Sequence, residues 1–204
     1  DPISYLALGD SYTIGEGVEA DARWPETLRD TLEQLGISMH PPQIIARTGW
    51  TTGELLDAMA ETELKPPYGL VSLLIGVNNQ YRGESRGYTL KEYEAEFSTL
   101  LGKAIELADG DPDRVLVLSI PDYSVTPFVG DQNKEKVSRE IEAYNQRKKQ
   151  LSLDAGVLFV DITPISQMAI NDQSLLVSDN LHPSEIMYRK WVEATLPLLL
   201  TSHS

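Results

Sequence analysis

The stretch Ile3-Ser4-Tyr5-Leu6-Ala7-Leu8, followed directly by Gly9-Asp10-Ser11, sets the pattern for the whole chain. Its first part is mostly apolar and contains β-branched and aromatic residues, as buried strands do, and the Gly-Asp pair then marks a turn. Four later runs share this apolar character: Gln43 to Ala46, Leu70 to Ile75, Val115 to Ile120 and Val157 to Val160. The sequence therefore predicts five buried strands.

Helical periodicity fills the intervals between these strands. The expected helices are Trp24 to Leu35, Thr52 to Glu63, Leu90 to Ala108, Asn133 to Leu153 and a last one beginning at Pro183. Proline suits the first position of a helix. Strands that are apolar throughout and alternate with helices form a parallel sheet with both faces covered. We therefore expect an α/β fold, a three-layer α/β/α sandwich.

Composition narrows the class of protein further. The chain has 204 residues without a Pro- or Ser-rich linker or an internal repeat, so a single domain over residues 1–204 is expected. Acidic residues outnumber basic ones by 31 to 17, and the resulting charge of −14 argues against nucleic acid or anionic lipid as a partner. Cysteine is absent, which excludes disulfides, thiolate nucleophiles and Cys-ligated metal sites.

The sequence has neither a run of about 18 apolar residues nor a secretory leader. We expect a soluble protein without a transmembrane segment, either cytoplasmic or exported after removal of a leader that this sequence does not contain. Nothing in the sequence indicates an oligomeric state.

Ser11 lies just beyond the predicted end of the first strand, at the sheet edge where ligands usually bind. A serine there suits a nucleophile, although a serine after Gly-Asp also often caps a helix or forms a turn. The hydroxyl needs a partner base near neutral pH. Of the three histidines, His40 is expected at the amino-terminal edge of the sheet and His203 in the tail. His182 is therefore the candidate base.

Asp179 precedes His182 by three residues, in Ser178-Asp179-Asn180-Leu181-His182-Pro183. A carboxylate at this spacing can accept the Nδ1 proton of the imidazole, which fixes the ring tautomer and stabilises the imidazolium formed during attack. The alternative is that Asp179 serves in a turn and His182 lies on the surface.

Gly49 and Asn78 each follow a predicted strand and can bind a developing oxyanion. A glycine at a strand end leaves its backbone N–H accessible, and the Asn78 side chain can donate from its amide. Both residue types are also common in turns, so each signal is weak alone. With Ser11, Asp179 and His182, they place a nucleophile, an acid–base pair and oxyanion donors at one edge of one sheet.

Loops at this edge also supply candidate substrate-binding residues. The segments Gly76 to Tyr88 and Pro121 to Gly130 are predicted to be long and irregular, and such loops are often functional. Side chains on or near the loops at this edge, most of them aromatic, are predicted to line a substrate pocket, although exposed aromatics also serve in packing. The candidates are Trp50, Tyr81 and Tyr123, with Arg82, Tyr88 and Phe128 as further ones.

This arrangement resembles the SGNH hydrolase superfamily, also called GDSL-type esterases and lipases. The resemblance spans nearly the whole chain, from Gly9-Asp10-Ser11 through Gly49 and Asn78 to Asp179-Asn180-Leu181-His182-Pro183. It implies a flavodoxin-like five-stranded sheet and a Ser11–His182–Asp179 triad. It also implies an oxyanion hole made by the backbone N–H groups of Ser11 and Gly49 with the Asn78 side chain, and neither a metal nor an organic cofactor.

Two residues depart from the pattern of this family. Tyr12 stands where the family has leucine, next to the nucleophile. Asn79 stands where the family has aspartate, which affects a supporting hydrogen bond because an amide can donate and a carboxylate cannot. Asp10 is expected to support the turn, since Asp179 already provides the orienting acid.

The sequence thus predicts a serine ester hydrolase that works through an acyl-enzyme on small or short-chain acyl esters. Lysophospholipids, thioesters and acetylated sugars are also compatible substrates. The alternative is a noncatalytic flavodoxin-like module in which residues 9–13 cradle a phosphate or nucleotide. Against it, Asp10 brings negative charge to that site and the chain has no P-loop lysine. A purely structural role is the third possibility.

Overall fold

The computed structural model describes residues 1–202 and contains a five-stranded sheet with the strand order β2-β1-β3-β4-β5. All neighbouring strands are parallel. The strands are β1 (Tyr5–Gly9), β2 (Gln43–Ala46), β3 (Leu70–Leu74), β4 (Val115–Leu118) and β5 (Leu158–Val160). This confirms the prediction of a parallel α/β sheet.

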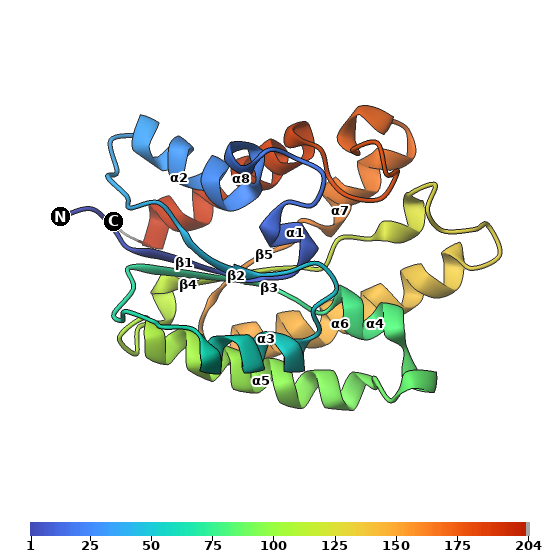
Figure 1. Cartoon of the computed structure of the whole chain (residues 1–204), viewed down its shortest axis with the longest axis horizontal. Coiled ribbons are helices and arrows are strands. Elements are labelled where there is room, and N and C mark those ends of the chain that lie inside the picture. The colour runs from blue at the N-terminus through green and yellow to red at the C-terminus, as the bar shows by residue number, and fades with distance from the viewer. Residues whose placement is uncertain (203–204) are drawn as a thin grey trace.

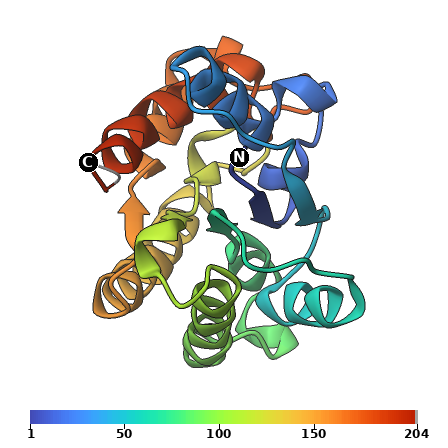
Figure 2. The same ribbon diagram turned by 90° about the vertical axis from the view of Figure 1, so that its left-hand side faces the viewer.

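Helices cover both faces of the sheet, as Figures 1 and 2 show. The layer above the sheet in Figure 1 contains α1 (Ser11–Ile14), α2 (Trp24–Gln34), α7 (Thr163–Gln167) and α8 (Glu185–Ser202). The layer below contains α3 (Thr52–Glu61), α4 (Val77–Arg82), α5 (Leu90–Leu107) and α6 (Lys134–Asp154). Short 3-10 helices occur at η1 (Ala20–Ala22), η2 (Glu84–Arg86), η3 (Pro112–Arg114), η4 (Tyr123–Val125), η5 (Met168–Ile170) and η6 (Gln173–Leu175).

The core lies between the sheet and the two helix layers. β1, β3 and β4 occupy the centre of the sheet, and every residue in them is buried. Trp24 of α2 and Trp191 of α8 are buried in one helix layer, and Tyr93 and Phe97 of α5 are fully buried in the other. Coverage on both faces explains why the central strands are almost continuously apolar instead of alternating.

The structure differs from the sequence-based expectations in some details. The segment Gly76 to Tyr88 is not irregular, because α4 and η2 form in it, whereas Pro121 to Gly130 is irregular apart from η4. The last helix begins at Glu185 and not at Pro183, since Pro183 pairs with Leu176 in an isolated antiparallel bridge that belongs to the preceding loop. The short helix α7 after β5 is not predicted by the sequence pattern.

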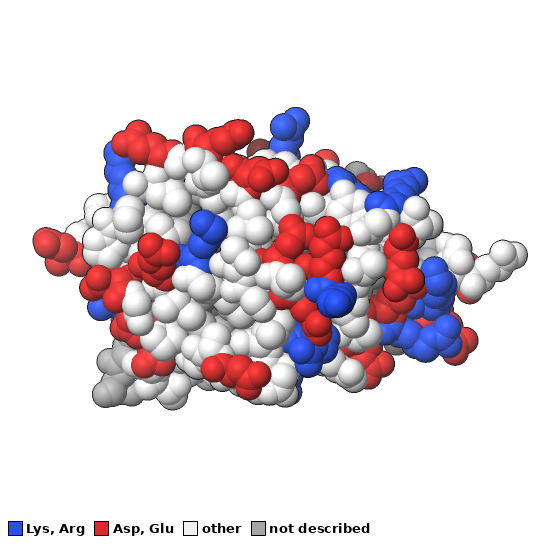
Figure 3. Space-filling view, turned by 90° about the horizontal axis from the view of Figure 1, so that it is seen from below, with Lys and Arg blue, Asp and Glu red and all other residues white. Residues whose placement is uncertain are grey.

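The surface reflects the net charge of −14. Figure 3 views the molecule from below, and acidic side chains are spread across this face with basic ones between them. A surface of this sign repels anions at low ionic strength. No helix within residues 1–202 combines the length and the apolar composition that a membrane crossing requires.

Candidate active site

Ser11 is the first residue of α1, directly after the tight turn that follows β1. Asp10 is the N-cap of α1, and its Oδ1 accepts a hydrogen bond from the Tyr12 N–H at 3.0 Å. The turn needs a glycine at position 9, because a Cβ on Gly9 would lie 2.3 Å from Thr13 Oγ1. The turn places Ser11 beyond the carboxyl end of β1, where its side chain lines a pocket.

His182 connects Ser11 to Asp179. Its Nε2 lies 3.1 Å from Ser11 Oγ, and its Nδ1 lies 2.5 Å from Asp179 Oδ2. With the proton on Nδ1, the ring donates to Asp179 and leaves Nε2 able to accept the serine proton. The structure thus brings together the three residues that the sequence analysis selected as nucleophile, base and orienting acid.

The loop before α8 holds Asp179 through its own backbone. Asp179 Oδ1 accepts hydrogen bonds from the N–H groups of Leu181 and His182, both at 2.9 Å. Asn180 adopts a φ of +60°, a left-handed conformation that asparagine tolerates better than most residues. The Val177 N–H closes the loop by donating to the His182 carbonyl at 2.9 Å. This local structure explains why a spacing of three residues is enough to pair the carboxylate with the imidazole.

These contacts favour the ionised form of Asp179. Partial burial raises the pKa of its carboxyl, but the hydrogen bonds from the His182 ring and from the two backbone N–H groups outweigh burial and lower that pKa below its ordinary value. The Asp179 side chain is 41% exposed, whereas the His182 side chain is 12% exposed. An ionised carboxylate in this position stabilises a positively charged imidazolium.

Tyr12, which stands in place of the family's leucine, packs against the histidine. Its ring centroid lies 5.8 Å from that of His182 and 6.2 Å from that of Trp191, and its own side chain is buried. The aromatic ring therefore restricts the imidazole from one side. Neighbouring Asp10 is buried as well, and this burial raises its pKa to about 7, against the opposing effects of the Tyr12 N–H and of the Lys148 charge.

Gly49 is the third residue of a β-turn that follows β2. The Trp50 N–H donates to the Arg47 carbonyl at 3.3 Å, and Gly49 has a φ of +91°, which together describe a type II turn. A Cβ on Gly49 would meet no atom within 4 Å, so the positive φ and not lack of space favours glycine here. Among the described residues, no acceptor takes a hydrogen bond from the backbone N–H of Gly49 or of Ser11. Both N–H groups are available to a ligand oxygen.

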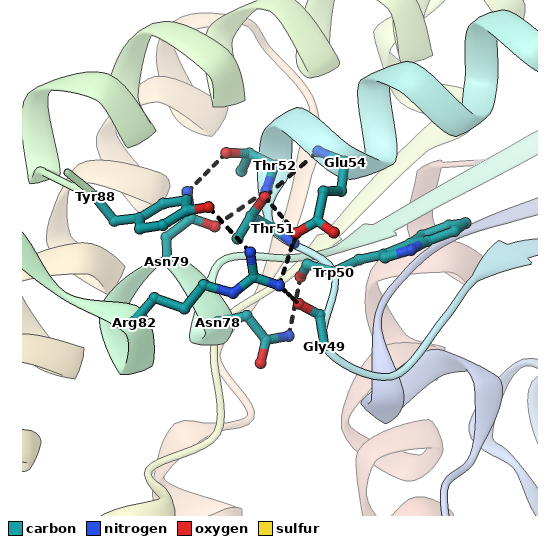
Figure 4. Close-up of polar contacts among 9 residues, drawn as sticks. All are labelled: Gly49, Trp50, Thr51, Thr52, Glu54, Asn78, Asn79, Arg82 and Tyr88. Carbon is teal, nitrogen blue, oxygen red and sulfur yellow. Dashed lines mark hydrogen bonds and ion pairs between the residues drawn. The ribbon is translucent and has the colours of Figure 1, made fainter. Parts of the chain in front are cut away.

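Asn78 and Asn79 lie in the first turn of α4 and contact the segment that follows β2 (Figure 4). Asn78 Nδ2 donates to the Trp50 carbonyl at 2.9 Å, which uses one of its two N–H groups and leaves the other for a ligand. Asn79 Oδ1 accepts from the Thr52 N–H at 3.1 Å, and Asn79 Nδ2 lies 2.8 Å from Thr52 Oγ1. An aspartate at position 79 can accept the first bond, but it can pair with the Thr52 hydroxyl only as an acceptor, whereas Asn79 donates to that hydroxyl.

A pocket of about 250 Å³ opens beside Ser11. Its walls bring together the carboxyl-edge loops and the loop before α8, and they are mostly aromatic and apolar. The lining residues besides Ser11 are Tyr12, Thr48, Gly49, Val77, Asn78, Tyr81, Tyr123, Phe128, Leu181 and His182. Thr48, Val77 and Leu181 could not be predicted from the sequence, because such side chains carry no chemical signature that marks a site.

Tyr81 and Tyr123 line this pocket, whereas the Trp50 side chain is not among its lining residues. The indole is half-buried and packs against the core. In Figure 4 it points away from Asn78, while the carbonyl of the same residue faces Asn78. The turn at residues 47–50 thus directs the backbone of Trp50 and not its side chain toward the site.

The other two histidines are not part of this arrangement. His40 is exposed, and its backbone N–H donates to the Ile3 carbonyl, near the amino-terminal end of β1. His203 lies outside the described residues.

Comparison with protein families shows where this arrangement belongs. The GDSL-like Lipase/Acylhydrolase family matches residues 7–190. The chain belongs to this family. The chain is therefore a hydrolase of carboxylic esters, and the resemblance to SGNH hydrolases is confirmed. Membership also overturns the alternative of a noncatalytic phosphate- or nucleotide-binding module.

Three solved structures are similar to this chain in fold. Axe2, an acetylxylan esterase from Geobacillus stearothermophilus, is 19% identical, with 97% of this chain and 94% of that chain covered and a TM-score of 0.73. TesA is 20% identical, with 98% and 99% covered and a TM-score of 0.70. The psychrotrophic esterase EstA from Pseudoalteromonas sp. is 18% identical, with 97% and 98% covered and a TM-score of 0.68. No curated protein sequence matches the chain.

Proposed function

We propose that this ester hydrolase acts on small or short-chain acyl esters through an acyl-enzyme formed on Ser11. The observation that carries the proposal is the continuous contact from Asp179 through His182 to Ser11, at 2.5 Å and 3.1 Å. A serine hydroxyl is a poor nucleophile near neutral pH, and a base held at this distance by an orienting carboxylate removes that obstacle.

In the first half of the reaction, Ser11 Oγ attacks the carbonyl carbon of the ester and its proton passes to His182 Nε2. The carbonyl oxygen becomes an oxyanion, which accepts hydrogen bonds from the Ser11 and Gly49 N–H groups and from the Asn78 amide. The imidazolium, stabilised by Asp179, then gives its proton to the alcohol oxygen. The alcohol leaves and the acyl group stays on Ser11.

In the second half, a water molecule gives a proton to His182 Nε2 and attacks the acyl carbon. The same donors bind the second oxyanion. When this intermediate collapses, the bond to Ser11 Oγ breaks, the proton returns from His182 to that oxygen, and the carboxylic acid is released.

The pocket favours a small acyl group. Its volume of about 250 Å³ lies below the range of roughly 300–1,000 Å³ typical of sites for drug-sized ligands. The apolar members of its wall, such as Val77 and Leu181, suit a short aliphatic chain. Acetylated sugars belong among the test substrates because the structurally similar Axe2 is an acetylxylan esterase. We also infer that residues 1–204 form one domain, since the family match spans residues 7–190.

A panel of 4-nitrophenyl esters of increasing acyl length, with acetylated xylo-oligosaccharides and a lysophospholipid, tests this proposal. We expect kcat/KM to be highest for acetyl to butyryl esters and to fall for longer chains. Ser11→Ala is expected to remove activity on every substrate. A preference for octanoyl or longer chains, or for the lysophospholipid, would contradict the substrate class. Full activity in Ser11→Ala would contradict the mechanism.

A further inference from the structure

Arg82, the last residue of α4, reaches back to the turn that carries Gly49 (Figure 4). Its Nη2 donates to the Gly49 carbonyl oxygen at 2.7 Å and also lies 2.8 Å from Glu54 Oε1. Its Nη1 donates to the Tyr88 hydroxyl at 3.0 Å, and the guanidinium lies 5.4 Å from the centroid of the Tyr88 ring. The guanidinium that holds the Gly49 carbonyl is therefore itself held from two further directions.

Glu54 ties this guanidinium to the start of α3. Thr51 is the N-cap of α3 and forms a reciprocal capping box with Glu54. Glu54 Oε1 accepts hydrogen bonds from the Thr51 N–H at 3.3 Å and from Thr51 Oγ1 at 3.1 Å. Burial lowers the pKa of Arg82, but the hydrogen bond with Tyr88 and the charge of Glu54 raise it above its ordinary value. Arg82 thus keeps its positive charge and its full set of donors.

Arg82 works together with two neighbours on α4. Asn78 holds the carbonyl of Trp50, and Asn79 holds the N–H of Thr52. With the bond from Arg82, side chains of a single helix fix the backbone over residues 49–52. The two expected oxyanion donors outside the Ser11 turn, the Gly49 N–H and the Asn78 amide, therefore belong to one connected unit.

The Gly49 carbonyl belongs to a turn with a conformationally free residue at its centre. Glycine has few steric restrictions, so a turn built on a glycine with a φ of +91° can change its dihedral angles more easily than other turns. A charged donor on the carbonyl limits rotation about ψ of Gly49 and keeps the turn in one conformation. An oxyanion donor is effective only when it is aimed before the charge develops.

We propose that Arg82 is a positioning residue for the oxyanion hole. By binding the Gly49 carbonyl, Arg82 holds this turn in place and keeps the Gly49 N–H directed toward the developing oxyanion. The inference rests on the proposed function, in which the Gly49 N–H binds that oxygen. Arg82 touches no reacting atom and acts through Gly49. Its contribution is made in the transition state, because the negative charge on the oxygen develops there.

Arg82→Met tests this inference, since methionine keeps an unbranched side chain but has no donor. With 4-nitrophenyl acetate, we expect kcat to fall about tenfold or more with a much smaller change in KM, which is less than the 10²–10³-fold expected for direct loss of a donor. Arg82→Lys is expected to recover part of kcat, because an ammonium can bind the Gly49 carbonyl but lacks the planar fork that also spans Tyr88 and Glu54. Arg86→Met is the matched control at an exposed arginine of η2 and is expected to equal the wild type.

The Ki of a trifluoromethyl ketone inhibitor is a measurement that a purely structural role of Arg82 would not change. The adduct of this inhibitor with the serine places a negatively charged oxygen in the oxyanion hole, so its Ki is expected to rise in Arg82→Met by the same factor by which kcat/KM falls. An unchanged Ki and kcat with a lower Tm would overturn the inference. A raised KM with kcat preserved would also overturn it, because Arg82 would then contact the substrate from the larger neighbouring pocket that it lines. If Arg82→Met does not fold, the same comparison is made with Arg82→Lys.

Ser11→Ala and Asn78→Ala separate failure of this inference from failure of the proposed function. If both lose activity while Arg82→Met behaves like Arg86→Met, only the role of Arg82 is refuted. If Ser11→Ala and Asn78→Ala both retain wild-type turnover, the proposed mechanism itself is wrong and the inference falls with it.

Discussion

His182 has one polar partner on each ring nitrogen, and the carboxylate on Nδ1 determines which proton the ring carries. The Asp179 side chain has two tasks that use different oxygens, because Oδ2 faces the imidazole and Oδ1 accepts the backbone N–H groups of the loop. A substitution that keeps one oxygen as an acceptor and changes the other therefore separates catalysis from loop structure.

Asp179→Asn makes this separation. The amide can keep the backbone bonds through its oxygen, while its NH₂ group faces Nδ1 and favours the tautomer with the proton on Nε2, which cannot accept the serine proton. We expect kcat to fall by up to about 10⁴-fold with little change in Tm. Steady-state kinetics and thermal denaturation check this result, with His40→Ala as the control that is expected to match the wild type. Wild-type turnover in Asp179→Asn would show that the carboxylate does not orient His182.

Among the elements, those with long apolar or periodic patterns could be predicted from the sequence, and those that depend on distant contacts could not. β2 is predicted at its observed bounds, and α5 ends one residue earlier than expected. The six-residue helix α4 is too short for a periodic signal, and flanking glycines at 76 and 83 make it resemble a loop.

The Asp179–His182 pair is local in sequence and could be predicted. The hydrogen bonds from side chains of α4 to the backbone of residues 49–52 join segments about 30 positions apart, so no local sequence pattern reveals them.

α6 carries a buried lysine, Lys148. Lys148 is fully buried, its Nζ donates to the Leu118 carbonyl at 2.9 Å, and it lies 5.6 Å from the centroid of the Phe97 ring. Burial lowers the pKa of Lys148 to about 7, although the charge of Asp10 raises it. Below that pH the folded protein holds a desolvated ammonium, which costs stability.

Lys148→Met tests this cost through its pH dependence. Between about pH 7 and the ordinary lysine pKa of about 10.4, the unfolded chain binds a proton that the folded wild type has lost, so the free energy of unfolding gains up to about 1.4 kcal/mol per pH unit from this residue. We expect wild-type stability to rise relative to Lys148→Met as the pH increases from 7 to 9.5. The loss of the ammonium also raises the pKa of Asp10 in the variant, which shifts the difference in the same direction. Urea denaturation measures both proteins, and parallel stability curves would contradict the expectation.

At the scale of the whole molecule, a net charge of −14 surrounds a pocket with mostly aromatic and apolar walls. The field of the molecule acts on charged ligands before they reach that pocket, and dissolved salt screens it. We expect an increase from about 20 to about 200 mM NaCl to raise kcat/KM for an anionic ester such as 4-nitrophenyl hemisuccinate and to leave that for neutral 4-nitrophenyl acetate nearly unchanged. Stopped-flow or steady-state rates at both salt concentrations decide this. An equal response of the two esters would show that the net charge does not influence substrate capture.

Peptide mapping by mass spectrometry after reaction with an organophosphonate tests the central claim, that Ser11 is the nucleophile, most directly. The probe forms a stable bond only with a hydroxyl that a nearby base activates. The arrangement of Ser11, His182 and Asp179 predicts one phosphonyl group per chain, located on Ser11, with hydrolytic activity lost in proportion to labelling. Labelling of a different residue, or complete loss of activity while Ser11 stays unmodified, would contradict the assignment.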